Sequence, residues 1–262
     1  MPKAAVASPP AHAVAGRAAG VWKRPSVRLS SPHMTRAPTR LEMLRSVTLT
    51  GLVQEEILHR IKTGELQAGA KLNEIDLAER LQTSRSPIRE AFRALEEAGL
   101  LKLEKNRGVF IREISDTEAA ELYQVRAGFD EMAGRLLAPS ISDAQLLELR
   151  TMLDQLEASS IKGGVNHYFP LNIAFHDRVV EMAGNSVLLG MYRQVVNRMH
   201  LLRRRGFAAA GSSKVSHAEH RLILEALTTR DPDAAGHAMR QHVLSGYQRA
   251  SSVRSAEEAA SG

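Results

Sequence analysis

The sequence predicts a mainly α-helical protein, in which an N-terminal winged helix-turn-helix, made of three helices and a small β-hairpin wing, precedes an all-α bundle of six to seven helices. Two short amphipathic segments joined by a tight turn, within residues 73–98, are typical of a helix-turn-helix. Apolar residues then alternate with polar ones on either side of a Gly-containing turn, which predicts the wing. From Asp116 onward every segment has helical periodicity, which predicts the bundle.

Length and charge distribution predict the domain boundaries. The 262 residues are 44% hydrophobic, which is enough for two domains with separate cores. The net charge is +6, but the first 41 residues alone carry +7, so the rest of the chain is close to neutral at −1. We therefore expect a disordered basic tail over 1–44, a winged helix-turn-helix domain over 45–115, an all-helical domain over 116–251 and a flexible tail over 252–262.

Composition excludes several classes of protein. The chain has no cysteine, so it has no disulfide framework, no thiolate metal site and no cysteine nucleophile. No apolar run approaches the roughly 20 residues that span a bilayer, and the N-terminal segment lacks the apolar core of a signal peptide. We expect a soluble, cytoplasmic protein without a membrane partner, in which any metal ligand is a His, Asp, Glu or Asn.

The first two helices are predicted from periodicity and capping residues. Helical periodicity begins near Leu49 and ends at Gly64, a residue type that commonly ends helices. Asn73 can accept a hydrogen bond from the first free amides of a short helix over 74–81. Each of the two segments is therefore predicted to be a short amphipathic helix.

A third helix and the wing follow. Ser84 begins a helix with a proline in its first turn, which suits proline, and this helix stops at Gly99. The alternating segments 101–104 and 109–112 then flank a polar turn over 105–108, which predicts a hairpin.

The third helix is the predicted DNA-reading element. A recognition helix enters the major groove with its N-terminus first, so its first turns carry the contacts. Arginine can bond guanine O6 and N7 together, whereas Ser hydroxyls and the helix N-terminus suit phosphate oxygens. Basic residues at a wing tip can reach a neighbouring groove or phosphate. The predicted DNA-binding residues are Ser84, Arg85, Ser86, Arg89, Arg93, Lys105, Arg107 and Gly108.

An ordinary amphipathic helix with a solvated basic face is the alternative interpretation, and periodicity alone supports both equally. Three acidic residues of the same helix, Glu90, Glu96 and Glu97, cannot usefully approach phosphates. We expect them to point away from DNA.

A family resemblance favours the DNA-reading interpretation. It rests on the segments LNEIDLAERL (72–81), SRSPIREA (84–91), LEEAGL (95–100) and NRG (106–108). These resemble the DNA-binding domain of the GntR family without a gap from Leu49 to Ile114. The resemblance implies that Ser84, Arg85, Ser86 and Arg89 lie at the DNA interface and that the wing enters the minor groove. The sequence departs at Ile75, where some members carry an Arg, so a contact made by that Arg is absent here.

A cluster of histidines predicts a metal site in the helical domain. Asn172 and His176 are four residues apart on one helix, so both side chains face the same way. His220 and His242 each share a helix face with apolar residues and are expected to point inward. Converging neutral imidazoles suit Zn(II) or Ni(II). A hydrogen-bonded core histidine is the alternative for each residue, and for a lone histidine it is the better interpretation.

The same residues resemble the FCD ligand-binding domain of FadR-like GntR regulators, in which Asp-x3-His is followed by one His in each of two later helices. The resemblance covers about Asp116 to Ala250 and implies the metal ligands Asn172, His176, His220 and His242. Asn172 replaces the usual Asp. Because an amide oxygen is a weaker ligand than a carboxylate, we expect weakened metal binding.

Arg126 and Asp130 form a second pair spaced for one helix face, and a plain intrahelical salt bridge explains that spacing. The FCD resemblance implies instead that Arg126 lies beside a cavity that binds small carboxylates, which a guanidinium can clamp. Arg203, Arg204 and Arg205 add charge near that cavity or form a solvated turn. The predicted effector-binding residues are Arg126, Asn172, His176, His220 and His242.

These observations predict a DNA-binding transcriptional repressor, homodimeric on a palindromic operator and controlled by a small carboxylate effector. A metal-dependent hydrolase fused to a DNA-binding module is the alternative, because three His ligands and a water also form a catalytic zinc site. Glu219 is the one nearby candidate base, but it lacks His-Glu-x-x-His spacing. A third possibility is DNA compaction through the basic tail. An affinity for DNA that depends on salt concentration alone, and not on sequence, would indicate it.

Overall fold

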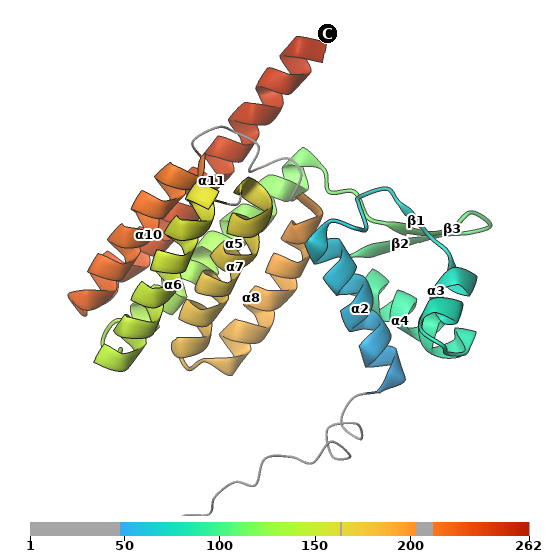
Figure 1. Ribbon diagram of the computed structural model, residues 1–262, viewed down its shortest axis with the longest axis horizontal. Helices are drawn as coiled ribbons and strands as arrows, with labels where there is room; N and C mark the ends of the chain where they lie inside the picture. The colour runs from blue at the N-terminus through green and yellow to red at the C-terminus, as the bar shows by residue number, and fades with distance from the viewer. Residues whose placement is uncertain (1–47, 163, 203–211, 262) are drawn as a thin grey trace, which may run out of the picture. The chain divides into compact units, whose positions relative to one another are not determined.

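The computed structural model describes residues 48–162, 164–202 and 212–261 (Figure 1). The predicted basic tail over 1–44 and the run Arg203, Arg204 and Arg205 lie outside the described residues. The first part of the described chain contains α2 (Leu49–Thr63), β1 (Lys71–Leu72), α3 (Glu74–Arg80), α4 (Arg85–Glu97), β2 (Leu101–Glu104) and β3 (Gly108–Ile111). The second part contains α5 (Asp116–Leu137), α6 (Asp143–Lys162), α7 (Gly164–Met182), α8 (Ser186–Met199), the 3-10 turn η1 (His200–Leu202), α10 (Ser212–Thr228) and α11 (Pro232–Ser261).

The helices begin and end at the residues that local chemistry favours. Thr48 accepts a hydrogen bond from the Gly51 amide at the start of α2, and Gly64 ends that helix with φ of +81°. Asn73 accepts a bond from the Ile75 amide at the start of α3, as predicted. The mainly α fold with an N-terminal winged helix-turn-helix is therefore confirmed.

The wing is a hairpin in a three-stranded antiparallel sheet with the order β1-β3-β2. Asn106 turns the chain at its tip with φ of 64°. Strand β1 was not predicted, because two residues are too short to show alternation. Its pairing of Leu72 with Val109 ties the start of α3 to the wing.

Burial fixes which face of α4 is exposed. Ile88, Ala91, Phe92 and Leu95 point into a core shared with α2, α3 and the sheet. Because these four residues follow helical spacing, the opposite face of α4 is left outside. That face carries the predicted DNA-reading side chains.

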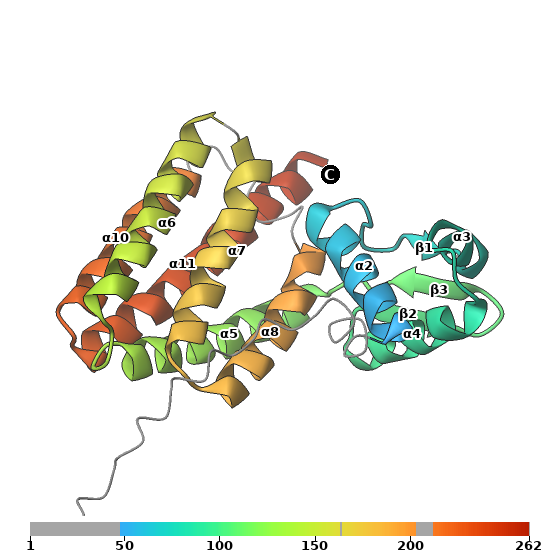
Figure 2. The same cartoon turned by 60° about the horizontal axis from the view of Figure 1, so that its bottom comes forward.

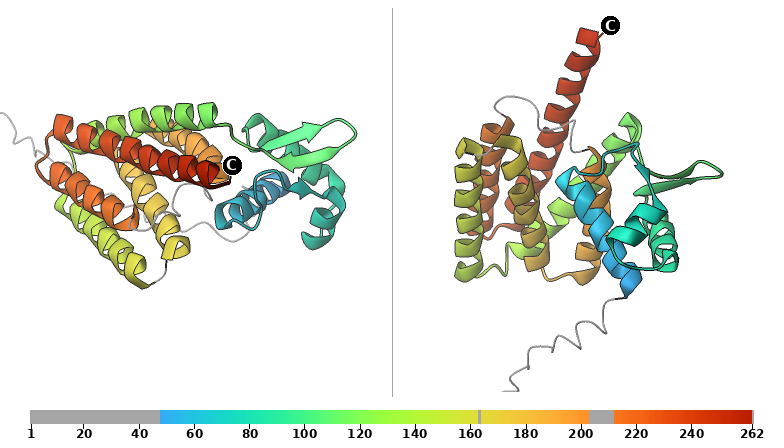
Figure 3. Two further views of the ribbon diagram at one scale, coloured as in Figure 1. Left: turned by 90° about the horizontal axis from the view of Figure 1, so that it is seen from above. Right: turned by 45° about the vertical axis from the view of Figure 1, so that its right-hand side comes forward.

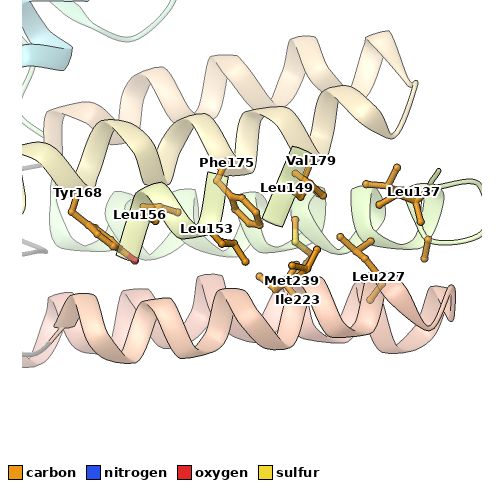
Figure 4. Packing of buried hydrophobic residues seen from close by; sticks show 14 residues of the cluster. Leu137, Leu149, Leu153, Leu156, Tyr168, Phe175, Val179, Ile223, Leu227 and Met239 are labelled. Carbon is orange, nitrogen blue, oxygen red and sulfur yellow. The ribbon is translucent and has the colours of Figure 1, made fainter. Parts of the chain in front are cut away.

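The second part of the chain is a bundle of long helices without strands among its described residues (Figures 2 and 3). Helix α5 packs along α11, and α6 packs against α7 and α10. Figure 4 shows the core that these helices share, which includes Leu137, Leu149, Leu156, Tyr168, Phe175, Val179, Ile223, Leu227 and Met239. No described helix is long and apolar enough to cross a bilayer.

Helices α5 and α11 touch through their backbones at two glycines. A Cβ added at Gly134 would lie 2.8 Å from the carbonyl oxygen of Ala235, and one added at Gly236 would lie 3.1 Å from the carbonyl oxygen of Glu131. Both distances are too short for a normal side chain to fit without movement. The two helices therefore lie as close as their main chains permit.

The C-terminal segment differs from its prediction. A flexible tail was expected over 252–262, but α11 continues to Ser261. Residues 254–260 include Ala, Arg and Glu, which favour helix, and no Gly or Pro interrupts the helix before Gly262. The polar composition that suggested a flexible tail is thus also compatible with a helix.

Candidate functional site

The leading side chains of α4 are available to a partner. Ser84, Arg85, Ser86, Arg89 and Arg93 are all exposed. Neither Arg85 nor Arg93 has a side-chain hydrogen bond or ion pair with any described residue. The structure therefore leaves two guanidinium groups free on the face that sequence analysis assigned to DNA.

Glu90 contacts both α2 and Ser86, so its expected position away from DNA stays a prediction. Its Oε2 accepts a hydrogen bond from the Thr50 hydroxyl in α2 at 2.9 Å. Its Oε1 lies 3.4 Å from Ser86 Oγ, which donates to it weakly. Glu90 thus joins α4 to α2.

Arg89 is held by a residue that sequence analysis did not single out. Its Nε lies 3.0 Å from Oε1 and 2.9 Å from Oε2 of Glu74, the first residue of α3. The hydrogen bond to Glu74 raises the pKa of Arg89. Fifteen residues separate the two positions, so no helical periodicity could have indicated the pair.

The wing tip is basic and exposed. Lys105, Arg107 and Gly108 are all exposed there. Arg107 forms an ion pair with Glu104 at 2.5 Å and lies 5.7 Å from the ring of Phe110. Their contact with DNA stays a prediction.

The three predicted histidines converge in the bundle. His176 in α7, His220 in α10 and His242 in α11 are all buried, and one nitrogen of each lies within 4.8 Å of the others. His176 Nε2 and His220 Nε2 are 3.2 Å apart. Side chains from three helices thus form a site that could hold a metal ion.

Carboxylates fix the orientation of two of these rings. His176 Nδ1 lies 3.0 Å from Asp130 Oδ1, and His242 Nδ1 lies 2.8 Å from Glu219 Oε2. Because an ionised carboxylate only accepts hydrogen bonds, each Nδ1 carries the proton and each Nε2 keeps a lone pair. In metal sites, a ligating imidazole commonly donates its other N–H to a carboxylate in this way.

The lowered pKa values of the three histidines favour the binding of a cation. Burial lowers the pKa of His176 to about 4, although Asp130 opposes the shift. Burial also lowers the pKa of His220 and of His242. All three rings are therefore neutral near pH 7, which is the form that binds metal. Facing lone pairs on His176 and His220 repel each other unless a cation or proton lies between them.

Asn172 supplies the fourth candidate donor. Its side chain is buried, and Oδ1 has no hydrogen-bond partner among the described residues. An unpaired buried carbonyl oxygen is costly, and a bound cation would satisfy it. The three converging imidazoles fit a divalent ion such as Zn(II) or Ni(II). Asn172 Oδ1 as a fourth ligand, weaker than a carboxylate, stays a prediction.

A cavity of about 60 Å³ adjoins this cluster. Arg126, Asn172 and His242 line it, whereas His176 and His220 do not. Three of the five predicted effector residues thus reach the cavity. The other lining residues include Tyr123, Phe169, Val196, His200, Ser216 and Arg249.

Arg126 agrees both with the ion pair expected from its spacing and with the cavity position that the FCD resemblance implies. Its Nε lies 3.4 Å from Asp130 Oδ2, so the intrahelical ion pair exists, and it also lines the cavity. Burial opposes its charge, but Tyr192 and Asp130 outweigh burial and raise the pKa of Arg126. A permanently charged guanidinium therefore faces the cavity.

Arg249 is a second cavity arginine that sequence analysis missed. It lies in α11 and donates two hydrogen bonds to Glu219, at 2.7 and 2.8 Å. Burial would raise the pKa of Glu219, but its bonds to His242 and Arg249 prevail and lower it to about 2. The partners are 30 residues apart on different helices, so only the folded chain reveals them.

Family models match both parts of the chain. Residues 49–111 match the model for bacterial regulatory proteins of the gntR family, and residues 121–245 match the FCD domain. Together these matches cover most of the described chain.

Individual relatives agree with these matches. The probable D-xylose utilization operon transcriptional repressor of Paenarthrobacter nicotinovorans is 30% identical over 205 residues, which cover 76% of this chain and 88% of the relative. The Nta operon transcriptional regulator of Aminobacter aminovorans is 31% identical over 176 residues, covering 67% and 81%. The solved structure of McbR/YncC from E. coli is similar with a TM-score of 0.68 and 25% identity, covering 77% of this chain and 98% of that one.

Proposed function

The chain belongs to the GntR family of bacterial regulatory proteins and carries an FCD domain, so it is a transcriptional regulator and not an enzyme; from this premise we propose that it is a cytoplasmic, homodimeric repressor whose operator binding is controlled by a small carboxylate. The observation that carries the proposal is the exposed leading face of α4, in a chain that also holds a separate arginine-lined cavity. A relative named as a probable repressor supports the direction of control.

The exposed face suits the major groove. Arg85 and Arg89 are one helical turn apart and exposed, so both can reach base edges when the N-terminus of α4 enters the groove. Ser84 and Ser86 lie at that N-terminus, where hydroxyls and free amides bind phosphate. Lys105 and Arg107 extend the contact to a neighbouring groove.

A second copy of the chain would give the palindromic recognition we propose. Helix α5 exposes apolar side chains on one face, with Val125, Met132 and Leu136 at 47%, 49% and 43% exposure. Their spacing of seven and four residues places them in one stripe. An exposed apolar stripe on a long helix suits a two-fold contact, because the same patch then covers itself on the partner. Two recognition helices would thereby face two half-sites.

The cavity suits an anion. Arg126 and Arg249 bring two guanidinium groups to its lining, and aromatic and apolar side chains complete it. Guanidinium binds a carboxylate through two parallel N–H bonds and is more selective for this shape than an ammonium group. Since FCD domains bind small-molecule effectors, a small carboxylate is the class that these residues favour.

A divalent ion would be held by His176, His220, His242 and the Oδ1 of Asn172. When bound, it would supply a positive charge close to the cavity that Arg126, Asn172 and His242 line. His176 and His242 are oriented for this by Asp130 and Glu219. The hydrolase alternative has no support, because Glu219, its candidate base, is already bonded to His242 and Arg249.

Selection and titration test the proposal. Full-length protein is used to select duplexes from random-sequence DNA, and the best duplex is titrated with and without a panel of small carboxylates. We expect a palindromic site with half-sites one helical turn apart and a carboxylate that weakens binding at least tenfold. Binding that follows salt concentration alone, without a preferred sequence, would instead support DNA compaction. Tighter binding with the carboxylate would overturn the repressor assignment.

A further inference from the structure

The geometry of the Arg89 side chain defines which of its N–H groups are available. Both carboxylate oxygens of Glu74 lie at hydrogen-bond distance from Nε, at 2.9 and 3.0 Å. Within the described part of the chain, neither terminal nitrogen of Arg89 has a hydrogen-bond partner. The guanidinium is therefore held through Nε, and the edge that carries its two terminal nitrogens is left available to a partner.

Glu74 is the better anchored of the two residues. It is the first residue of α3, where Asn73 caps the helix and the helix N-terminus favours a carboxylate. Its side chain is 26% exposed, compared with 60% for Arg89. Glu74 therefore fixes Arg89 and not the reverse, because the less exposed position at the capped helix start has less freedom.

The outer edge of a guanidinium matches guanine. Its two terminal nitrogens can donate parallel bonds to O6 and N7, the most common specific contact in the major groove. An unrestrained arginine loses much rotamer freedom when it adopts this geometry, whereas a restrained one has lost most of it beforehand. Glu74 also cancels the charge of Arg89 toward phosphate, which lowers affinity for DNA of any sequence.

We propose that Glu74 is a specificity-determining positioning residue, which holds Arg89 by Nε so that its two terminal nitrogens read a guanine, and which suppresses binding to other sequences. The inference rests on the proposed operator binding. Arg85 provides the contrast within the same helix, because it is exposed and has no partner among the described side chains. Arg85 is therefore expected to bind operator and phosphate without such restraint.

Binding measurements on full-length variants test this role. Glu74→Ala and Glu74→Gln are compared with Glu79→Ala, which removes an exposed carboxylate from the same helix that has no side-chain partner among described residues. Each protein is titrated with the selected operator, with operators in which each guanine pair is replaced in turn, and with random-sequence duplex, at several salt concentrations. Thermal unfolding shows which variants keep the fold.

The expected result is two changes of opposite sign. Glu74→Ala lowers the discrimination at one guanine about tenfold or more, and at the same time tightens binding to random duplex several-fold with a steeper salt dependence. Glu74→Gln, which keeps an acceptor but no charge, gives a smaller loss of discrimination. A merely structural role for Glu74 would weaken binding to all duplexes together.

The Arg89→Ala variant distinguishes a failure of the positioning role of Glu74 from a failure of operator recognition by Arg89. If Arg89→Ala loses discrimination at the same guanine and Glu74→Ala adds nothing to it in the double variant, the positioning role stands. If Arg89→Ala loses discrimination and Glu74→Ala behaves like Glu79→Ala, the positioning role is wrong while operator recognition stands. If Arg89→Ala leaves base preference intact, the recognition assignment itself is wrong.

Discussion

The guanidinium of Arg249 closes on the carboxylate of Glu219, donating to both oxygens at 2.7 and 2.8 Å. The same Glu219 oxygen that receives Arg249 Nη2 also accepts from His242 Nδ1 at 2.8 Å. Since Arg249 lines the cavity and His242 is a proposed metal ligand, one carboxylate connects the two candidate binding sites.

Glu219→Gln is expected to weaken metal binding about 10- to 100-fold, because the bond that orients His242 and raises the basicity of its Nε2 is weakened. Zn(II) affinity is measured by competition with a coloured chelator. Glu225→Gln on the same helix is the control, since Glu225 is exposed and has no hydrogen bond or ion pair among described side chains. Equal affinities for both variants would remove Glu219 from the metal site.

Asn172→Asp is expected to raise metal affinity at least tenfold, because a carboxylate replaces the neutral amide oxygen. Asn172→Ala should lower it. Metal content after purification without chelator and titration with Zn(II) or Ni(II) provide the measurement. An affinity that does not respond to either substitution would mean that Asn172 does not face the ion.

Arg85→Ala and Arg89→Ala are each expected to cost about 1 to 3 kcal/mol of operator binding and to relax base preference. Lys105→Ala should instead weaken binding to all sequences and lower the salt slope by about 1. Arg150→Ala, an exposed arginine on α6, serves as the control. The assignment of α4 would be wrong if both α4 variants bound the operator like the unaltered protein.

Met132→Glu and Leu136→Glu are expected to convert the dimer to monomers, because each places a charge in the proposed apolar contact on α5. Light scattering on the eluting protein measures the mass. Leu147→Glu replaces a leucine on α6 that is 66% exposed and should leave the mass unchanged. If all three proteins keep the mass of a dimer, the contact lies elsewhere.

Gly134→Ala is expected to lower the free energy of unfolding by about 1 to 3 kcal/mol, because the new methyl group overlaps the Ala235 carbonyl. Gly190→Ala in the middle of α8 has no neighbour within 4 Å and should raise stability by roughly 0.5 to 1 kcal/mol. Urea unfolding measures both. Equal effects would show that the α5–α11 contact is looser than its geometry indicates.

Features with a local cause were predictable from the sequence. The start of α3 at Asn73, the stop of α2 at Gly64 and the wing turn at Asn106 follow from the conformational preferences of those residues. Inward-facing histidines also followed from periodicity. Their convergence needed the family resemblance, because periodicity assigns a face to each helix without saying which faces meet.

Contacts between distant positions were not predictable. Glu74 with Arg89 and Glu219 with Arg249 join charges on separate helices, and any exposed charge could have had other partners. Strand β1 was missed for a related reason, since its two residues become a strand only by pairing with β3. These contacts position side chains in the proposed sites, and local sequence patterns do not indicate them.

The glycine contact between α5 and α11 has a consequence for ligand choice. Arg126 stands on one of these helices and Arg249 on the other. A side chain at Gly134 would overlap the Ala235 carbonyl, and the Arg135 side chain packs over Gly236, so this close contact restricts movement of α5 against α11. We therefore expect the main-chain positions that carry Arg126 and Arg249 to keep a constant separation, so that the proposed cavity would select a ligand by the distance between its negative groups.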